Sequence, residues 1–204
     1  MFASQGATQW QWSMSFKYSV DFALWIIEQD GLTVDGLAPI TGGHNDLSAV
    51  GLTAENWRDW VRLLADREII HAQNVPIGQT KATLPPDLAN PYSYFDNDIA
   101  LKAKLRPLWY QYLAQSAQRS QCTEGLHKEI APTPQQGASF WQAVKSARGT
   151  APSLNIILTG YPFYTEYLVS DATLILSPGG KCLKHEDLCN IFVRTLQKMQ
   201  KVMA

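Results

Sequence analysis

The chain has 204 residues and a formal net charge of -1, with 17 Lys and Arg against 18 Asp and Glu. Its length suits one large domain, and we expect a single globular domain over residues 1–204. Charged residues make up 17% of the chain, against about 25% in typical proteins. A chain with so few surplus cations is a poor candidate for a protein whose main partner is nucleic acid, or for a regulator of DNA or RNA.

The first pattern is a strict alternation near the N-terminus, with an apolar residue at every second position: Trp10, Trp12, Met14, Phe16, Tyr18, Val20 and Phe22. A period of two places these residues on one face of a strand. The residues that follow are apolar on nearly every side and end at Asp30 and Gly31, which predicts a buried helix closed by a glycine. We therefore expect the strand to become a helix near Ser19.

The next predicted helix begins after a glycine-rich loop over residues 31–51. Thr53 is a good N-cap residue, and an apolar stripe follows it, which predicts a helix to about His71. This stripe consists of Trp57, Trp60, Val61 and Leu64. The segment from Asn74 to Tyr92 is rich in proline and is predicted to be a loop.

Two more helices are predicted in the middle of the chain. Apolar residues recur at helical spacing between Leu101 and Leu113, and Pro107 either kinks one helix there or begins a second. Thr133 and Gln136 form a capping-box pattern around Pro134, which predicts a further helix that stops at Gly149.

After residue 152 the pattern changes to short β-branched segments at 154–160, 164–169 and 172–177. We interpret them as two or three strands, and expect antiparallel pairing because their connections are too short for a long crossover. A last helix is predicted from about Lys184, with Leu188, Ile191, Phe192, Leu196 and Met199 on one side. The expected fold class is α+β: a small, mostly antiparallel sheet, made of the N-terminal strand and two or three strands within 153–177, packed with about five helices.

The cysteines and the hydropathy indicate the compartment. Three cysteines, at wide spacing, do not suggest a disulfide framework. The opening residues lack the basic and apolar regions of a signal peptide. The longest apolar run, Phe22 to Ile27, is far shorter than the roughly 20 residues that cross a bilayer. We expect a cytoplasmic protein without membrane insertion.

One group of residues has the chemistry of a metal site. Cys182, His185 and Cys189 lie within eight positions, and Cys122 and His127 could complete a tetrahedral set. The spacing matches no common zinc pattern, and Cys189 is equally explained as a small apolar core residue. We therefore predict no metal and no cofactor.

Two loops could line the pocket of a small enzyme. The loop from Gly42 to Asp46 contains His44, which with Asp46 could act as an acid–base pair. The turn from Gly160 to Tyr167 follows a predicted strand, where pockets often form. Both loops are also explained as ordinary polar turns. No nucleophile elbow, zinc-binding helix motif or phosphate-binding loop is present in the sequence.

The aromatic face of the opening segment is the candidate binding site, with Trp10, Trp12, Met14 and Phe16 as its residues. It is either a half-buried strand of the protein's own sheet or an arm that adds to the sheet of a partner or of a second copy. Seven tryptophans and little charge suit a desolvated contact. We predict a non-enzymatic protein–protein interaction module (an adaptor, an assembly factor or a subunit of a complex), with a small enzyme as the alternative.

Overall fold

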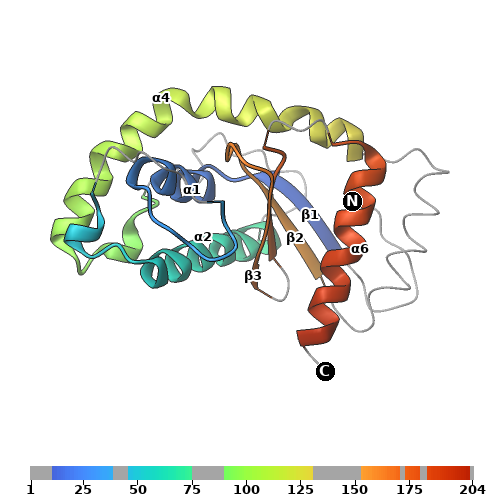
Figure 1. Cartoon of the computed structure of the whole chain (residues 1–204), viewed down its shortest axis with the longest axis horizontal. Coiled ribbons are helices and arrows are strands. Elements are labelled where there is room, and N and C mark those ends of the chain that lie inside the picture. The colour runs from blue at the N-terminus through green and yellow to red at the C-terminus, as the bar shows by residue number, and fades with distance from the viewer. Residues whose placement is uncertain are drawn as a thin grey trace.

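The structure is a computed structural model, and it describes residues 11–38, 46–74, 90–130, 153–170, 173–179 and 183–202. The chain order of the elements is β1 (Gln11–Phe16), α1 (Tyr18–Asp30), the 3-10 helix η1 (Ser48–Val50), α2 (Ala54–Asn74), the 3-10 helix η2 (Ser93–Phe95), α4 (Ile99–Ile130), β2 (Ser153–Leu158), β3 (Thr165–Ser170), β4 (Thr173–Ser177) and α6 (His185–Val202). Figure 1 shows these elements. The predicted α+β class is confirmed.

The four strands form one sheet in the order β1-β2-β4-β3. As predicted, the N-terminal strand joins the strands from the end of the chain. The expectation of a mostly antiparallel sheet was wrong, because β1 pairs with β2 and β2 with β4 in parallel. Of the strand pairs in the described residues, only β3 and β4 are antiparallel. The chain leaves β2, returns as β3 at the outer edge, and then runs as β4 between the two, so the short connection after β2 does not join neighbours.

The change from strand to helix falls near Ser19, as predicted. Strand β1 stops at Phe16, and α1 begins at Tyr18 after a single extended residue, Lys17. The alternation continues formally into α1 because every residue of that helix from Ser19 to Ile27 is buried. As predicted, α1 ends at Gly31, which has a φ of 69° and donates its N–H to the carbonyl of Ile27 at 2.9 Å.

The start of α2 and the path of the chain at Pro107 follow from local features of the sequence. The Thr53 hydroxyl accepts the backbone N–H of Asn56 at 3.2 Å, which confirms Thr53 as the residue that starts α2. Pro107 lies inside a single continuous helix, α4, so it does not begin a second one. The helix predicted from Thr133 to Gly149 and most of the proline-rich loop lie outside the described residues.

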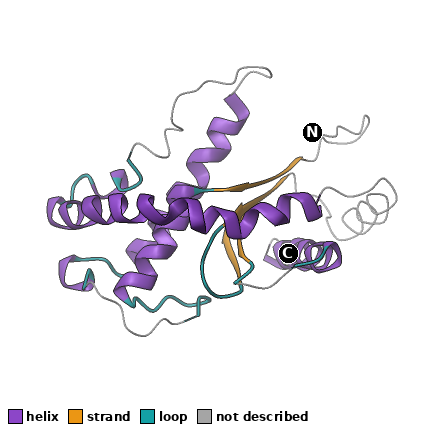
Figure 2. Ribbon diagram, turned by 90° about the horizontal axis from the view of Figure 1, so that it is seen from above, coloured by secondary structure: helices purple, strands orange, loops and turns teal. Residues whose placement is uncertain are grey.

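The sheet is covered by helices on both faces. Ile157 and Ile175 belong to the core that α1, α2 and α4 share. Their neighbours Ile156 and Leu176 are also fully buried, and alternation along a strand turns them to the other face. Figures 1 and 2 show the sheet between α2 and α6, so α6 lies on that other face. None of the described helices combines the length and the apolar character that crossing a bilayer requires.

Four tryptophans are part of the core between α1, α2 and α4: Trp25, Trp57, Trp60 and Trp109. The indole N–H of Trp57 donates to the carbonyl of Ala23 at 2.8 Å, and that of Trp60 to Pro91 at 2.7 Å. The indole N–H groups of Trp57 and Trp60 therefore have hydrogen-bond acceptors inside the protein, as buried indoles require. The high tryptophan content is explained in large part by this core.

Candidate interaction site and a buried charge cluster

Among the strands that the structure describes, β1 forms one border of the sheet, since β2 is its one neighbour in the strand order. The two strands stay in register over all six residues, from Gln11 opposite Ser153 to Phe16 opposite Leu158. The segment QWSMSF contains no charged residue, no proline and no glycine. In the part of the chain that the structure describes, no strand pairs with the outer side of β1.

The ladder with β2 determines which backbone groups point outward. Lys17 donates its N–H to the carbonyl of Leu158 at 3.5 Å. Successive residues of a strand direct their backbone groups to opposite edges, so Ser13 and Ser15 also face β2. The N–H and C=O groups of the three remaining positions, Trp12, Met14 and Phe16, therefore lie along the outer edge.

The opposite border of the sheet, β3, differs from β1. Its pairing with β4 is irregular between Leu168 and Ser170. Its Glu166 carboxylate pairs with the guanidinium of Arg194 on α6 at 2.5 Å, and also accepts the hydroxyl of Tyr164. Bulges and charged side chains are the means by which edge strands avoid pairing with other chains. Strand β3 has both, and β1 has neither.

The predicted binding residues are only partly described. Phe16 is half-buried, and its ring packs edge-on against Tyr18 with 5.1 Å between the ring centres. Trp12 and Met14 lie in register with Leu154 and Ile156 on β2. Trp10 lies outside the described residues. The interpretation of this segment as a strand of the protein's own sheet is confirmed, and its use by a partner stays a prediction.

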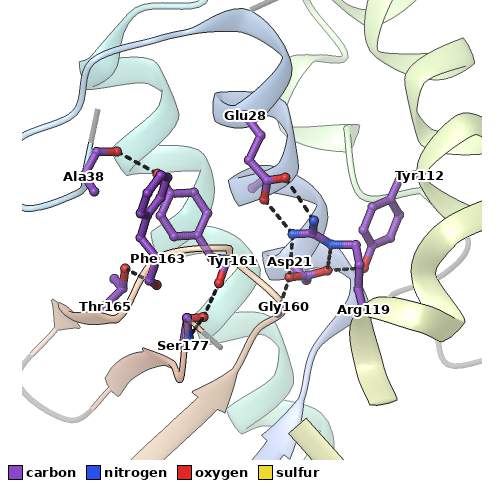
Figure 3. Close-up of polar contacts among 12 residues, drawn as sticks. Asp21, Glu28, Ala38, Tyr112, Arg119, Gly160, Tyr161, Phe163, Thr165 and Ser177 are labelled. Carbon is purple, nitrogen blue, oxygen red and sulfur yellow. Dashed lines mark hydrogen bonds and ion pairs between the residues drawn. The ribbon is translucent and has the colours of Figure 1, made fainter. Parts of the chain in front are cut away.

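A second feature, which was not predicted from the sequence, is a cluster of charged side chains between α1 and α4 (Figure 3). Asp21 is fully buried and accepts four hydrogen bonds. They come from Arg119 Nε at 2.7 Å, Arg119 Nη2 at 3.1 Å, the Tyr112 hydroxyl at 2.9 Å and the Gly160 backbone N–H at 2.7 Å. The other side of the Arg119 fork binds Glu28, with distances of 3.0 and 2.7 Å.

The electrostatics of this cluster follow from burial and pairing. Burial raises the pKa of Glu28, although hydrogen bonds from Arg119 oppose the rise. Burial alone would lower the pKa of Arg119, but hydrogen bonds to both carboxylates outweigh it and raise that pKa. Burial and the Asp21 charge raise the pKa of Tyr112, so its phenol stays a donor. The four donors to Asp21 come from α4 and from the turn after β2, so the cluster joins α1 to both of these elements.

The cluster lies where parallel strands end. Asp21 is in the first turn of α1, which follows β1, and Gly160 follows the end of β2. One sequence signal for the cluster was present: Asp21 is the one charged residue in the stretch from Ser19 to Ile27, which is apolar at most positions and buried throughout. Its partners could not be found the same way, since Arg119 is 98 positions away.

Comparison of this chain with the models of known protein families, with curated proteins and with solved structures finds no match.

The two predicted enzyme loops are held by internal hydrogen bonds where they are described. Asp46 is exposed and accepts from the Ser48 hydroxyl at 2.6 Å, which lowers its pKa. His44 lies outside the described residues. In the second turn, the buried Tyr161 donates its hydroxyl to the carbonyl of Ala38 at 2.9 Å, and burial raises the pKa of this phenol to about 12. The Ser177 hydroxyl donates to the Tyr161 carbonyl at 2.5 Å.

The described residues do not place the candidate metal ligands next to one another. Cys182 lies outside the described residues, and the side chains of Cys122, His127 and His185 are not described. Cys189 lies on α6, and burial raises the pKa of its thiol. Within the described ranges, no group of three His, Cys, Asp or Glu residues is placed to hold a metal ion. The absence of a metal stays a prediction.

Proposed function

We propose that the protein is a non-enzymatic protein–protein interaction module of the cytoplasm, an adaptor, an assembly factor or a subunit of a complex, and that it binds an extended strand along the outer edge of β1. The observation that carries this proposal is the contrast between the two borders of the sheet. Strand β3 is irregular and charged, while β1 is regular, six residues long and uncharged. Natural sheets protect an edge that must stay unpaired.

Strand addition would use the backbone groups of Trp12, Met14 and Phe16, which lie along this edge. Main-chain hydrogen bonds provide the affinity in such complexes, and alternate side chains provide the specificity. The low charge of the chain, 17%, favours a contact that must be desolvated. A cytoplasmic location is supported by the cysteine content, which does not suggest a disulfide framework.

The test uses the direction of the Met14 N–H. The variant Met14→Pro removes an outward N–H, and proline is tolerated on an edge strand when its N–H would face solvent. The matched control Met14→Val keeps the N–H and favours a strand. We expect the two variants to unfold at similar temperatures. We expect Met14→Pro to lose proteins that the wild type and Met14→Val capture from extracts of the source cells.

Amide hydrogen exchange on the captured complexes completes this test. The amides of Trp12, Met14 and Phe16 should become protected when the partner binds, because they would then donate to its strand. Equal capture by all three proteins, together with unprotected amides at these positions, would refute the use of β1.

A small enzyme with a pocket near the Gly42–Asp46 loop or the Gly160–Tyr167 turn is the second candidate. It is favoured by the place of the second turn, since Gly160 and Tyr161 follow the carboxyl end of a parallel strand, where α/β proteins bind ligands. A screen of metabolites by thermal unfolding separates the two candidates. A ligand that raises the unfolding temperature by several degrees would favour the enzyme, because binding to the native state stabilises it.

A further inference from the structure

We infer that the strand added to β1 is β1 of a second copy of this chain, running antiparallel around a two-fold axis at Met14. This inference rests on the proposed use of the β1 edge and names its occupant. Figure 1 shows β1 at the border of the sheet away from β3. Pairing there would join the two four-stranded sheets into one continuous sheet.

The spacing of the outward backbone groups fits this symmetry. Trp12 and Phe16 lie at equal distances in sequence from Met14, and all three residues direct their N–H and C=O groups outward. A two-fold axis at Met14 places it opposite its own equivalent, and Trp12 opposite Phe16 of the second copy. Each hydrogen-bonded pair of an antiparallel ladder exchanges two bonds, so the three pairs make about six backbone hydrogen bonds. A closed dimer requires such self-complementarity.

The charge pattern of the segment removes the usual obstacle to self-pairing. A two-fold axis places the residue on it opposite its own equivalent and brings the rest of the two segments together, and like charges opposite one another are destabilising. The segment from Gln11 to Phe16 has no charged residue. The first charge, Lys17, falls opposite Gln11 of the second copy in this register rather than opposite its own equivalent.

The residue types at the paired positions are also complementary. The register places an aromatic residue opposite an aromatic residue at both ends of the paired segment, Trp12 with Phe16 in each case. Aromatic cross-strand pairs are among the more favourable pairs in sheets. Methionine, at the centre, adapts its shape to neighbours and contacts aromatic rings favourably.

The first test measures the oligomeric state of the full chain by size-exclusion chromatography with light scattering over a range of concentrations. We expect a dimer for the wild type and for Met14→Val, and a monomer for Met14→Pro. A wild-type dimer that Met14→Pro leaves unchanged would overturn the inference, because that dimer would use another surface.

The second test checks the register by disulfide formation. In the proposed pairing, Ser13 lies opposite Ser15 of the second copy in a non-hydrogen-bonded pair, where side chains are closest. A mixture of Ser13→Cys and Ser15→Cys chains should form a disulfide between residues 13 and 15 under mild oxidation, and Ser13→Cys alone should not link to itself. Peptide mapping by mass spectrometry identifies this bond whatever the native cysteines do.

The outcomes separate the inference from the proposed function. A wild type that is monomeric at all concentrations and forms no bond between residues 13 and 15 would show that β1 does not pair with itself. If Met14→Pro then still abolishes capture of another protein, the edge is an interaction site with a different occupant. If it does not, both proposals are wrong.

Discussion

Asp21 and Arg119 lie 98 positions apart in the chain and meet in a two-point ion pair, with Arg119 Nε 2.7 Å from Oδ2 and Nη2 3.1 Å from Oδ1 of Asp21. Asp21 is fully buried, so its charge depends on this partner for compensation. The same carboxylate accepts the N–H of Gly160 at 2.7 Å. The pair therefore connects α1, α4 and the end of β2 at one point.

Removing the cation from this cluster should be costly. The variant Arg119→Met leaves Asp21 and Glu28 buried without a counter-charge, and we expect a loss of about 3–5 kcal/mol in the free energy of unfolding. Urea unfolding followed by circular dichroism measures it. The control is Arg58→Met, because Arg58 is 3.9 Å from Asp35 in an exposed pair, which predicts a loss below about 1 kcal/mol. Equal losses in the two variants would contradict the assigned role of Arg119.

Glu28 should make stability depend on pH. Burial raises the pKa of Glu28 above its ordinary 4.5, so the folded state binds this proton more tightly than the unfolded chain does. The stabilisation is present in full below the ordinary pKa and is lost as the pH rises through the raised one. Each tenfold difference in proton affinity corresponds to about 1.4 kcal/mol.

The variant Glu28→Gln isolates this effect, because glutamine does not titrate. From pH 4.5 towards neutrality, we expect the wild type to lose stability relative to Glu28→Gln. Denaturant unfolding of both proteins at several pH values measures the difference. A difference that stays constant over this range, or that changes in the opposite direction, would show that burial does not dominate at Glu28.

Gly160 should not tolerate a side chain. A Cβ atom at this position would lie 2.9 Å from Cβ and 3.0 Å from the backbone oxygen of Arg119. We expect Gly160→Ala to cost about 1–3 kcal/mol, as overpacking typically does. Gly36→Ala is the comparison for a cost that comes from the backbone and not from overpacking. The Cβ at position 36 would meet the Tyr167 ring at 3.4 Å, and the φ of 88° would add backbone strain. A neutral Gly160→Ala variant in thermal unfolding would mean that α4 and this turn are not in close contact.

The start of α2 offers a smaller and independent test. The Thr53 hydroxyl accepts the Asn56 N–H at 3.2 Å, so Thr53→Ala should lower the unfolding free energy by about 1 kcal/mol. Thr53→Ser keeps the hydroxyl and should change it much less. If the serine variant is as unstable as the alanine variant, the cap contributes little and the threonine methyl group is the important part.

Several elements of this fold could be predicted because their signals are local. Thr53 and the apolar stripe after it predict α2, and Gly31 predicts the end of α1, because caps and periodicity act within a few residues. The predicted change from strand to helix near Ser19 also agrees with the structure, because α1 begins at Tyr18. The alternation itself runs on to Phe22, and α1 is buried from Ser19 to Ile27, so the end of β1 was predicted from the change to a continuously apolar stretch and not from the end of the alternation.

Part of the candidate site could also be predicted from the sequence, and part could not. The aromatic alternation around Met14 predicted a strand, and β1 is one. Its position at the border of the sheet was not predictable from that alternation, because any neighbouring strand would satisfy its backbone groups equally. The cluster of Asp21, Glu28 and Arg119 was missed, since charged residues on separate helices carry no sequence signal that pairs them.

The sequence by itself determined the helices and strands whose patterns repeat within a turn or a pleat, the mixed α+β class and the scarcity of charge. The tertiary structure alone decided that β4 lies between β2 and β3 and that β1 borders the sheet. It also decided that Asp21 is compensated by Arg119. The physical reason is that strand order, edge position and ion pairing depend on which distant segments pack together, and that choice is made by burial of the whole core rather than by neighbours in the chain.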